Sequence, residues 1–180
     1  ASGQAKLLYS EKMSVESLYL GINPATYDDG IVSGNDRAEL LSDPRARQAL
    51  AICLDRQSVV DDVLHGLVSV PDSYIPNAHP LYTPLIDLYA FDPTAGAELL
   101  AEIGWKDVDN NENTPRIAYN VTGVPSGSEL ILNYVTTTSI QRRQASEILA
   151  TSLQRCGIGV NVEYLTPEEF YAPAPDGILL

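Results

Sequence analysis

A strand pattern, a helix pattern and a second strand pattern follow one another in residues 128–165, SELILNYVTTTSIQRRQASEILATSLQRCGIGVNVEYL. In residues 158–165 apolar side chains alternate with polar or small ones, which is typical of a strand with one buried face. Residues 139–157 have apolar side chains at helical spacing and end in glycine, a common helix stop. The side chains expected on the buried face of this helix are Ala145, Ile148, Leu149, Leu153 and Cys156.

A helix of this length between two strands favours a right-handed crossover, which makes the two strands parallel. The sequence therefore predicts an α/β fold, in which helices pack on a mixed sheet.

A second helical unit lies upstream in residues 42–66, SDPRARQALAICLDRQSVVDDVLHG. Asp43 can act as its N-cap. Pro44 suits the first helical position, because proline lacks a backbone N–H and an N–H at that position would have no acceptor within the helix. Asp55 offers a second N-cap, and Gly66 is a predicted stop. The apolar stripe of the first half consists of Ala46, Ala49, Leu50, Cys53 and Leu54. We expect two short helices, or one helix bent near Asp55.

The Asp-Pro opening recurs at Asp92–Pro93, and the helix pattern that follows it ends at Gly104. Its apolar stripe consists of Ala95, Leu99, Leu100 and Ile103. Near the C-terminus, Thr166 and Glu169 form a capping-box pattern with proline at the first helical position. Pro173 is expected to keep that helix short.

The N-terminal part contains a predicted strand over residues 15–23, because Leu18, Leu20 and Ile22 alternate with less apolar positions. Residues 5–9 form a shorter apolar segment that could pair beside this strand.

Three segments are predicted to be loops. Residues 24–36 are rich in Gly, Asp and Pro, and residues 106–116 are polar. Residues 68–87 contain four prolines, which remove backbone donors and disfavour a helix. We therefore expect a long extended connection there, and connections of this length are usually functional or packed across a neighbouring surface.

The composition indicates one globular domain, residues 1–180, with little affinity for nucleic acid. Hydrophobic residues make up 44% of the chain, and the formal net charge is −13. Nucleic-acid binding depends on clustered Lys and Arg, and Arg142–Arg143 is the only tight basic cluster. No apolar run approaches the ~20 residues that span a bilayer. The first ten residues lack the zones of a signal peptide, so if the protein is secreted we expect its signal to have been removed or to lie outside this chain.

Residues suited to catalysis are sparse. The two histidines are His65, at a predicted helix end, and His79, in the proline-rich connection. We interpret both as structural or exposed. The sequence has no G-x-S-x-G nucleophile motif and no phosphate-binding loop.

Metal and redox sites also lack support. The paired carboxylates at 28–29, 61–62 and 168–169 are interpreted as solvated or capping residues. The Asp-rich run 107–113 lacks the central glycine and final glutamate of an EF-hand. Cys53 and Cys156 fall on apolar helix faces, and we interpret them as buried small hydrophobic residues in preference to a disulfide. We predict no cofactor and no metal.

Tyrosine is unusually frequent among the aromatic residues of this chain, which has ten tyrosines, two phenylalanines and one tryptophan. Its apolar ring and polar tip suit the wall of a wet binding crevice, although many of the ten are expected to be ordinary half-buried surface residues.

The order of the motifs resembles the family 5 extracellular solute-binding proteins, the binding components of peptide, dipeptide and nickel ABC importers. The most specific matches are the run Arg45–Leu50 with Asp55–Arg56, and the helix from Asp92–Pro93 to Gly104–Trp105. The similarity extends over roughly residues 15–180. It implies one lobe of a two-lobed clamp of the type II periplasmic-binding-protein kind. A complete member is about three times longer, so this chain resembles a fragment of the second lobe.

The resemblance implies ligand capture between lobes without catalysis, in the periplasm or in a cell-surface lipoprotein. The implied partners are a peptide or small-molecule ligand, an ABC permease, and the membrane through a lipid anchor outside this chain. The candidate ligand-binding residues are Tyr19 and Asn23 at the end of the first predicted strand, followed by Tyr74 and Tyr82. Arg47 and Asp55 are expected to have structural roles.

The sequence leaves two other functions open. The chain could be a small hydrolase that uses His65 or His79, or a protein-interaction module with an acidic surface. The nature of the ligand is open as well, since peptide, oligosaccharide and metal-chelate importers share this scaffold.

Overall fold

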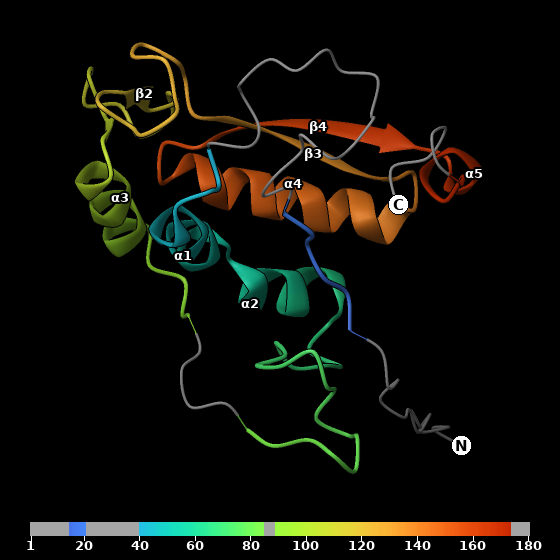
Figure 1. The fold of residues 1–180 in the computed structure, drawn as a ribbon. Helices are drawn as coiled ribbons and strands as arrows, with labels where there is room; N and C mark the ends of the chain where they lie inside the picture. The colour runs from blue at the N-terminus through green and yellow to red at the C-terminus, as the bar shows by residue number, and fades with distance from the viewer. Residues whose placement is uncertain (1–14, 21–39, 85–88, 174–180) are drawn as a thin grey trace, which may run out of the picture.

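The long helix α4 lies along two parallel strands, as the strand–helix–strand pattern predicts (Figure 1). The computed structural model describes residues 15–20, 40–84 and 89–173. In chain order the elements are α1 (Pro44–Cys53), α2 (Arg56–Ser58), the π-helical turn η2 (Val59–Val63), α3 (Pro93–Glu102), β1 (Trp105–Lys106), β2 (Ile117–Ala118), β3 (Ile131–Thr137), α4 (Ile140–Gln154), β4 (Gly159–Leu165) and α5 (Pro167–Phe170).

Strands β3 and β4 pair in parallel from Ile131 opposite Gly159 to Thr137 opposite Leu165. A separate antiparallel pair joins β1 to β2. The α/β class is therefore confirmed, but in the described part of the chain the two kinds of pairing belong to two small sheets instead of one mixed sheet. The β1–β2 pair was not predicted, because strands of two residues carry no alternating pattern.

Two serines lie in the buried face of α4, where only apolar residues were expected. The Ser146 hydroxyl donates to the carbonyl of Arg143 and lies 3.1 Å from the Tyr164 hydroxyl on β4. The Ser152 hydroxyl donates to the carbonyl of Leu149 and accepts from the backbone N–H of Asp55. Both hydroxyls are satisfied, so their burial carries no large desolvation cost.

The helical unit of residues 42–66 divides at Asp55, as predicted. Asp43 accepts from the backbone N–H of Arg45 at the start of α1, and Asp55 accepts from the N–H of Ser58 at 3.0 Å. The expected structural role of Arg47 agrees with its contacts, because its guanidinium donates to the carbonyls of Leu41 and Ser42. The second half continues as the π-helical turn η2 and ends where His65 and Gly66 adopt positive φ.

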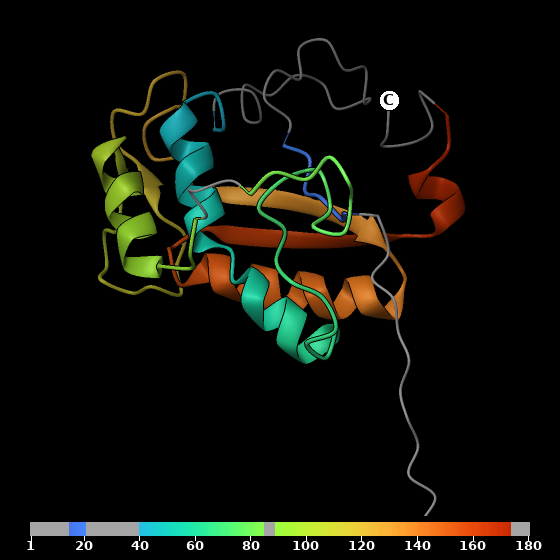
Figure 2. The ribbon, with the colours of Figure 1, turned by 90° about the horizontal axis from the view of Figure 1, so that it is seen from below.

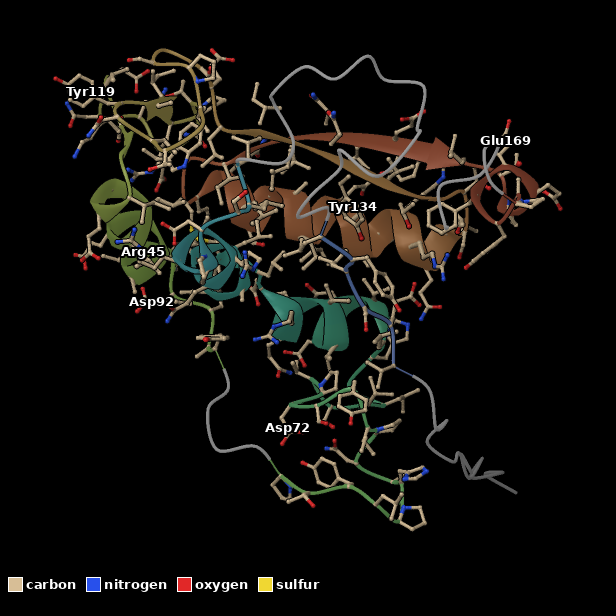
Figure 3. The ribbon with its side chains drawn as sticks, viewed as in Figure 1. Arg45, Asp72, Asp92, Tyr119, Tyr134 and Glu169 are labelled. Atoms are coloured by element: carbon tan, nitrogen blue, oxygen red, sulfur yellow. A yellow bond between two sulfur atoms is a disulfide. The ribbon has the colours of Figure 1, made fainter. Side chains whose placement is uncertain are left out.

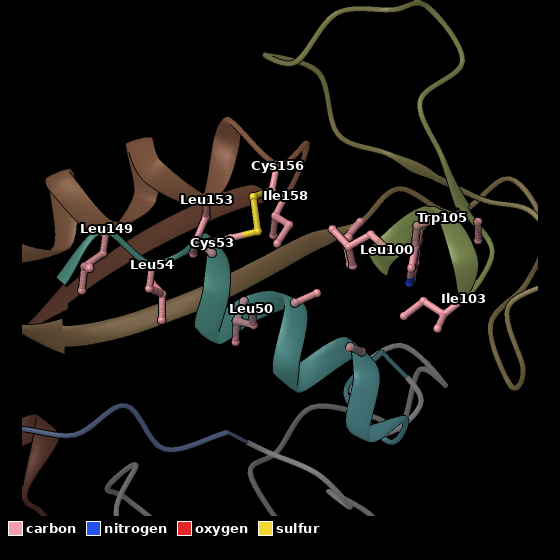
Figure 4. Packing of buried hydrophobic residues seen from close by; sticks show 14 residues of the cluster. Leu50, Cys53, Leu54, Leu100, Ile103, Trp105, Leu149, Leu153, Cys156 and Ile158 are labelled. Carbon is pink, nitrogen blue, oxygen red and sulfur yellow. A yellow bond between two sulfur atoms is a disulfide. The ribbon is translucent and has the colours of Figure 1, made fainter. Parts of the chain in front are cut away.

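The main core lies where α1, α3 and the C-terminal half of α4 meet (Figure 4). Helices α1 and α3 pack against each other, and Trp105 is fully buried beside them. The buried cluster consists of Ala46, Ala49, Leu50, Cys53, Leu54, Leu100, Ile103, Trp105, Ala118, Leu130, Leu149, Leu153, Cys156 and Ile158. Every member of the predicted stripe of α1 belongs to this cluster.

The interpretation of the two cysteines was wrong. Cys53 and Cys156 form a disulfide inside this core, with their Cα atoms 6.2 Å apart (Figure 4). Helical spacing correctly predicted that both would be buried, but it contains no information on their distance across 103 residues of chain. Gly96 of α3 packs against the sulfur atoms, and a Cβ atom there would lie 2.2 Å from Cys53 Sγ.

The predicted strand over residues 15–23 is also wrong where the structure describes it. Residues 15–20 form no strand; Leu20 packs against the core, whereas Leu18 is exposed. Alternation alone does not make a strand without a ladder partner, and residues 15–20 have none among the residues that the structure describes. Residues 21–23, the segment 5–9 and the loop 24–36 lie outside the described residues.

The remaining local predictions agree with the structure. Asp92 caps α3, Gly104 follows its end with positive φ, and Thr166 and Glu169 make the capping box of α5. Residues 68–84 form neither helix nor strand, as expected for the proline-rich connection. In the ranges that the structure describes, none of the helices has the length and apolarity needed to cross a membrane.

Candidate ligand-binding surface

The tyrosines predicted to face a ligand come from two segments, residues 15–20 and the loop 66–84. Both segments lie below α4 in Figure 1, and in the view from below the loop crosses in front of the β3–β4 pair (Figure 2). Tyr19 is 87% exposed and Tyr74 is 86% exposed, whereas Tyr82 is half-buried. Asn23 lies outside the described residues. No hydrogen bond joins Tyr19, Tyr74 and Tyr82 to one another in the described part of the structure.

A side-chain hydrogen bond of Tyr82 links two parts of the loop 66–84. Its hydroxyl donates to Asp72 Oδ2 at 2.7 Å, across ten residues of the loop. This hydrogen bond raises the pKa of the Tyr82 phenol, and partial desolvation and the negative charge of Asp72 raise it further. This bond helps to fix the shape of the loop, and the contact of Tyr82 with a ligand stays a prediction. Figure 3 shows Asp72 in this lower loop.

Further hydrogen bonds fix the turns of the same loop. The N–H of His79 donates to the carbonyl of Pro76, and the N–H of Tyr82 donates to the carbonyl of His79. His79 Nδ1 accepts from the N–H of Leu81 at 3.1 Å. The side-chain amide of Asn77 donates to Ser69 Oγ. A loop packed by its own contacts in this way can present outward-pointing side chains at defined positions.

The outward-pointing side chains of the two segments are mainly apolar. We use the name apolar surface for Leu18, Tyr19, Leu67, Val68, Tyr74 and Leu81, which are all exposed. These six account for more than half of the eleven large hydrophobic residues that are exposed in the described chain. They are candidates for an interaction site, because exposed apolar groups mark such sites where they form a contiguous patch.

Two hollows lie elsewhere on the molecule. The larger, of about 420 Å³, is formed by α3, the loop 107–114 and residues around Arg116 and Arg155. The smaller, of about 330 Å³, lies between α4 and the start of the α2–η2 unit. None of Tyr19, Tyr74 and Tyr82 lines either hollow.

Several polar side chains that line or border the larger hollow make hydrogen bonds within the chain. Arg116 donates from Nε to the carbonyl of Cys156 and from Nη1 to the carbonyl of Trp105, and burial lowers its pKa. In the Asp-rich loop, Asp107 accepts from the N–H of Asp109, and Asp109 accepts from the Thr114 hydroxyl. Among the residues that the structure describes, no group of three or more His, Cys, Asp or Glu side chains is placed to hold a metal ion.

Sequence reasoning missed two groups that organise the predicted site. Asp72 had no signal beyond its place in a loop, although it is the partner of Tyr82. The sequence marks Arg142 only as part of a basic pair, yet it forms an ion pair with Glu16 of the segment 15–20 at 2.7 Å. The first contact lies within one loop and the second joins residues that are distant in sequence, and neither residue type at those positions indicates its partner.

Residues 2–178 match the family described as bacterial extracellular solute-binding proteins, family 5 Middle. The chain is 27% identical over 135 residues to a probable ABC transporter-binding protein of Deinococcus radiodurans, covering 72% of this chain and 21% of that protein. It is 38% identical over 85 residues to the oligopeptide-binding protein AppA of Bacillus subtilis, covering 44% of this chain and 15% of AppA.

A solved structure is similar in fold. The oligopeptide-binding protein of Thermus thermophilus, complexed with a pentapeptide, superposes with a TM-score of 0.62 at 28% identity, over 72% of this chain and 21% of that one. The chain thus spans about a fifth or less of the length of these relatives. The family match covers nearly the whole chain, and the fold agrees with it. The chain belongs to the family 5 bacterial extracellular solute-binding proteins.

Proposed function

We propose that this chain is part of the extracytoplasmic substrate-binding component of an ABC importer, and that its ligand is a peptide. The observation that carries the proposal is the family match over residues 2–178, together with relatives whose names refer to oligopeptide or ABC-transporter binding. The chain then forms part of one lobe of a two-lobed clamp, residues 1–180 being one domain. The ABC permease and a lipid anchor are partners of the longer protein.

The physical mechanism is closure around a ligand. The contacts of a ligand with both lobes exist only in the closed state, so binding shifts the population toward that state. In this lobe the apolar surface supplies the contacts, because Tyr19 and Tyr74 are exposed on segments that are held by internal hydrogen bonds or an ion pair. Because the backbone of these segments is already held, mainly the side-chain rotamers of the two rings have to be ordered when they meet a ligand.

The disulfide supports a location outside the cytoplasm. Disulfides persist in secreted and periplasmic proteins and are rare where glutathione and thioredoxin keep thiols reduced. The bond between Cys53 and Cys156 is almost completely buried, which agrees with a structural role in an oxidising compartment.

Catalysis is not part of the proposal. His79 uses Nδ1 to accept a backbone hydrogen bond, and His65 lies exposed in the turn that ends η2. Neither arrangement supports the pairing of a nucleophile with a base that the hydrolase alternative requires.

The test compares Tyr19→Ala and Tyr74→Ala with Tyr119→Ala in the longer protein that contains this chain. Tyr119 is 67% exposed and lies at the far end of the molecule from Asp72 and its loop (Figure 3), so it is a matched control. Affinity for a panel of peptides, oligosaccharides and metal chelates is measured by isothermal titration calorimetry.

We expect peptide binding, with at least one of the Tyr19 and Tyr74 variants weakened about 5- to 30-fold, the usual effect of removing one aromatic contact. Tyr119→Ala is expected to bind like the unmodified protein. Binding of oligosaccharides or chelates without binding of peptides would contradict the proposed ligand. Unchanged affinity in both tyrosine variants would contradict the proposed surface. The isolated 180-residue chain cannot close, so we expect no peptide binding at micromolar concentration.

A further inference from the structure

The disulfide between Cys53 and Cys156 joins two helical elements and is covered by a third. Cys53 ends α1, and Cys156 lies two residues beyond the end of α4 (Figure 4). Both cysteines are at most 1% exposed. Helix α3 contains neither cysteine, but it packs against α1 and its Gly96 contacts the sulfur atoms. An element that takes no part in the bond therefore separates it from solvent on that side.

The contact between α3 and the sulfur atoms leaves no space for a further group. A Cβ atom on Gly96 would lie 2.2 Å from Cys53 Sγ and 3.1 Å from Cys156 Sγ, so even a methyl group does not fit there. One turn earlier, the carbonyl oxygen of Pro93 lies 3.5 Å from Cys156 Sγ. On the other sides the sulfur atoms are enclosed by the buried cluster of the main core.

Thiol–disulfide exchange needs space beside the sulfur that is attacked. A thiolate attacks one sulfur, the S–S bond breaks, and the second sulfur leaves as a thiolate while the attacking group stays bound in a mixed disulfide. The mixed disulfide thus carries a new substituent on Cys53 or Cys156. This substituent is larger than the methyl group that has no room beside Gly96. The chemistry is therefore incompatible with the packed position of α3.

Helix α3 can move without separating the two cysteines. Directly after α1, the backbone N–H of Asp55 donates to the Ser152 hydroxyl of α4 at 3.1 Å, so the elements that hold the cysteines are also attached to each other. Helix α3 is attached by its packing on α1 and β1 and by a hydrogen bond from the N–H of Asp92 to the carbonyl of Ile52. Loss of these contacts releases α3 and leaves the contact of α1 with α4 in place.

The larger hollow reaches the edge of the contact between α3 and the disulfide. Its wall includes Pro93 and Ala97 of α3 together with Cys156 and Gly157. Because this edge already borders a hollow, an outward movement of α3 would extend the hollow to the sulfur atoms. A reagent could then reach the bond without complete unfolding of the domain.

We propose that α3 is a cover that controls the redox chemistry of Cys53 and Cys156, so that their bond forms and is reduced only while α3 is open. In formation, one cysteine thiolate attacks a disulfide oxidant such as oxidised glutathione and releases one glutathione thiolate. The second cysteine thiolate then displaces the other glutathione. The pair loses two electrons and two protons, and the oxidant becomes two thiols. When α3 closes over the product, it protects the bond from reductants.

The first test compares reduction of the oxidised chain in Asp92→Ala and Asp43→Ala. The two variants are matched, because each removes the N-cap of a ten-residue helix that begins with Asp-Pro, α3 in the first and α1 in the second. A detached helix of ten residues is unstable in water, so loss of the α3 cap shifts α3 toward the open state. Reduction by excess dithiothreitol is followed by alkylation of the free thiols and mass spectrometry.

We expect Asp92→Ala to be reduced about three- to tenfold faster than the unmodified chain, and Asp43→Ala less than twofold faster. Equal acceleration in the two variants would mean that the bond reacts only after global unfolding. An unchanged rate in Asp92→Ala would mean that reductant reaches the sulfur atoms with α3 in place. Each of these two results overturns the proposal.

The second test reproduces the mixed disulfide, through which both formation and reduction pass. Glutathione is attached to Cys53 of the variant Cys156→Ser under denaturing conditions, and the chain is refolded. Hydrogen–deuterium exchange is compared with that of the same variant carrying a free Cys53. We expect the amides of α3 to exchange at least tenfold faster when glutathione is attached, and those of α4 and β4 to change less than twofold.

Protection of α3 that survives the attached glutathione overturns the proposal, because the mixed disulfide would then fit beneath a closed α3. Equal loosening of α3 and α4 overturns it as well, since the whole domain would then yield instead of the cover. If Cys156→Ser does not fold, the two N-cap variants, which keep the disulfide, still decide.

Discussion

The core around the disulfide and the loop below α4 use their side chains in opposite ways. In the core, α1, α3 and the end of α4 bury apolar residues around the bond between Cys53 and Cys156. In the loop 66–84 apolar residues such as Tyr74 and Leu81 point outward, and polar contacts such as Tyr82 with Asp72 face inward. The core thus provides stability, and the loop presents the side chains that can meet a ligand.

Breaking the disulfide should have the largest effect on the core. A bond that closes a loop of about 100 residues restricts the unfolded chain strongly, so Cys53→Ser/Cys156→Ser should lower the free energy of unfolding by about 2–5 kcal/mol. Urea denaturation of the oxidised chain and of the double variant measures this difference. A loss well below 1 kcal/mol would mean that the bond is not a main support of the core.

Gly96→Ala should give the next largest effect. The new methyl group would meet Cys53 Sγ, and the crowding should cost about 1–3 kcal/mol even though alanine favours a helix. Thr94→Ala on the exposed side of α3 is the control and should be close to neutral. If the cost is due to the sulfur atoms, it should shrink when both cysteines are serine. The same cost without the disulfide would point to another contact.

Tyr82→Phe should affect the loop and spare the core. It removes the hydrogen bond to Asp72 but keeps the ring, so hydrogen exchange should quicken in residues 66–84 while the unfolding midpoint hardly moves. An equal loss of protection in α1 and α3 would contradict the separation of the two regions.

The same bond predicts a dependence on pH. Because the folded state raises the pKa of Tyr82, the loop is stabilised by the protonated phenol. The contribution is complete below the ordinary tyrosine pKa of about 10 and is lost as the pH rises through the higher folded value. Exchange of the loop, measured relative to Tyr82→Phe, should therefore show a difference at pH 8 that vanishes at strongly alkaline pH.

Tyr74→Ala should have the smallest effect on stability. The ring is almost fully exposed, so the free energy of unfolding should change by less than about 0.5 kcal/mol. Thermal denaturation checks this value. A clear destabilisation would mean that Tyr74 supports the loop and is not available for a ligand.

The sequence predicted the local structure best where a pattern and its end signals occur together. The caps at Asp43, Asp55, Asp92 and Thr166 were all correct, because an N-cap acts within three residues of its helix. The parallel pairing of β3 and β4 was correct as well, since the crossover helix between them favours it.

Contacts between distant segments could not be predicted in the same way. The buried serines of α4, the disulfide and the ion pair of Glu16 with Arg142 each depend on which faces meet after folding. In the candidate site, the sequence selected Tyr19 and Asn23 first, and Tyr74 and Tyr82 next. The structure separates the two exposed rings from Tyr82, whose hydroxyl is used inside the loop.

The most direct test of the division between scaffold and ligand-binding surface is a hydrogen-exchange footprint of peptide on the longer protein. Saturating peptide should slow exchange in residues 15–20 and 66–84, and should leave α1, α3 and the region of Cys156 unchanged. Protection confined to α3 and the loop 107–114 would instead place the ligand in the larger hollow. That result would contradict the assignment of the apolar surface as the ligand-binding side of this lobe.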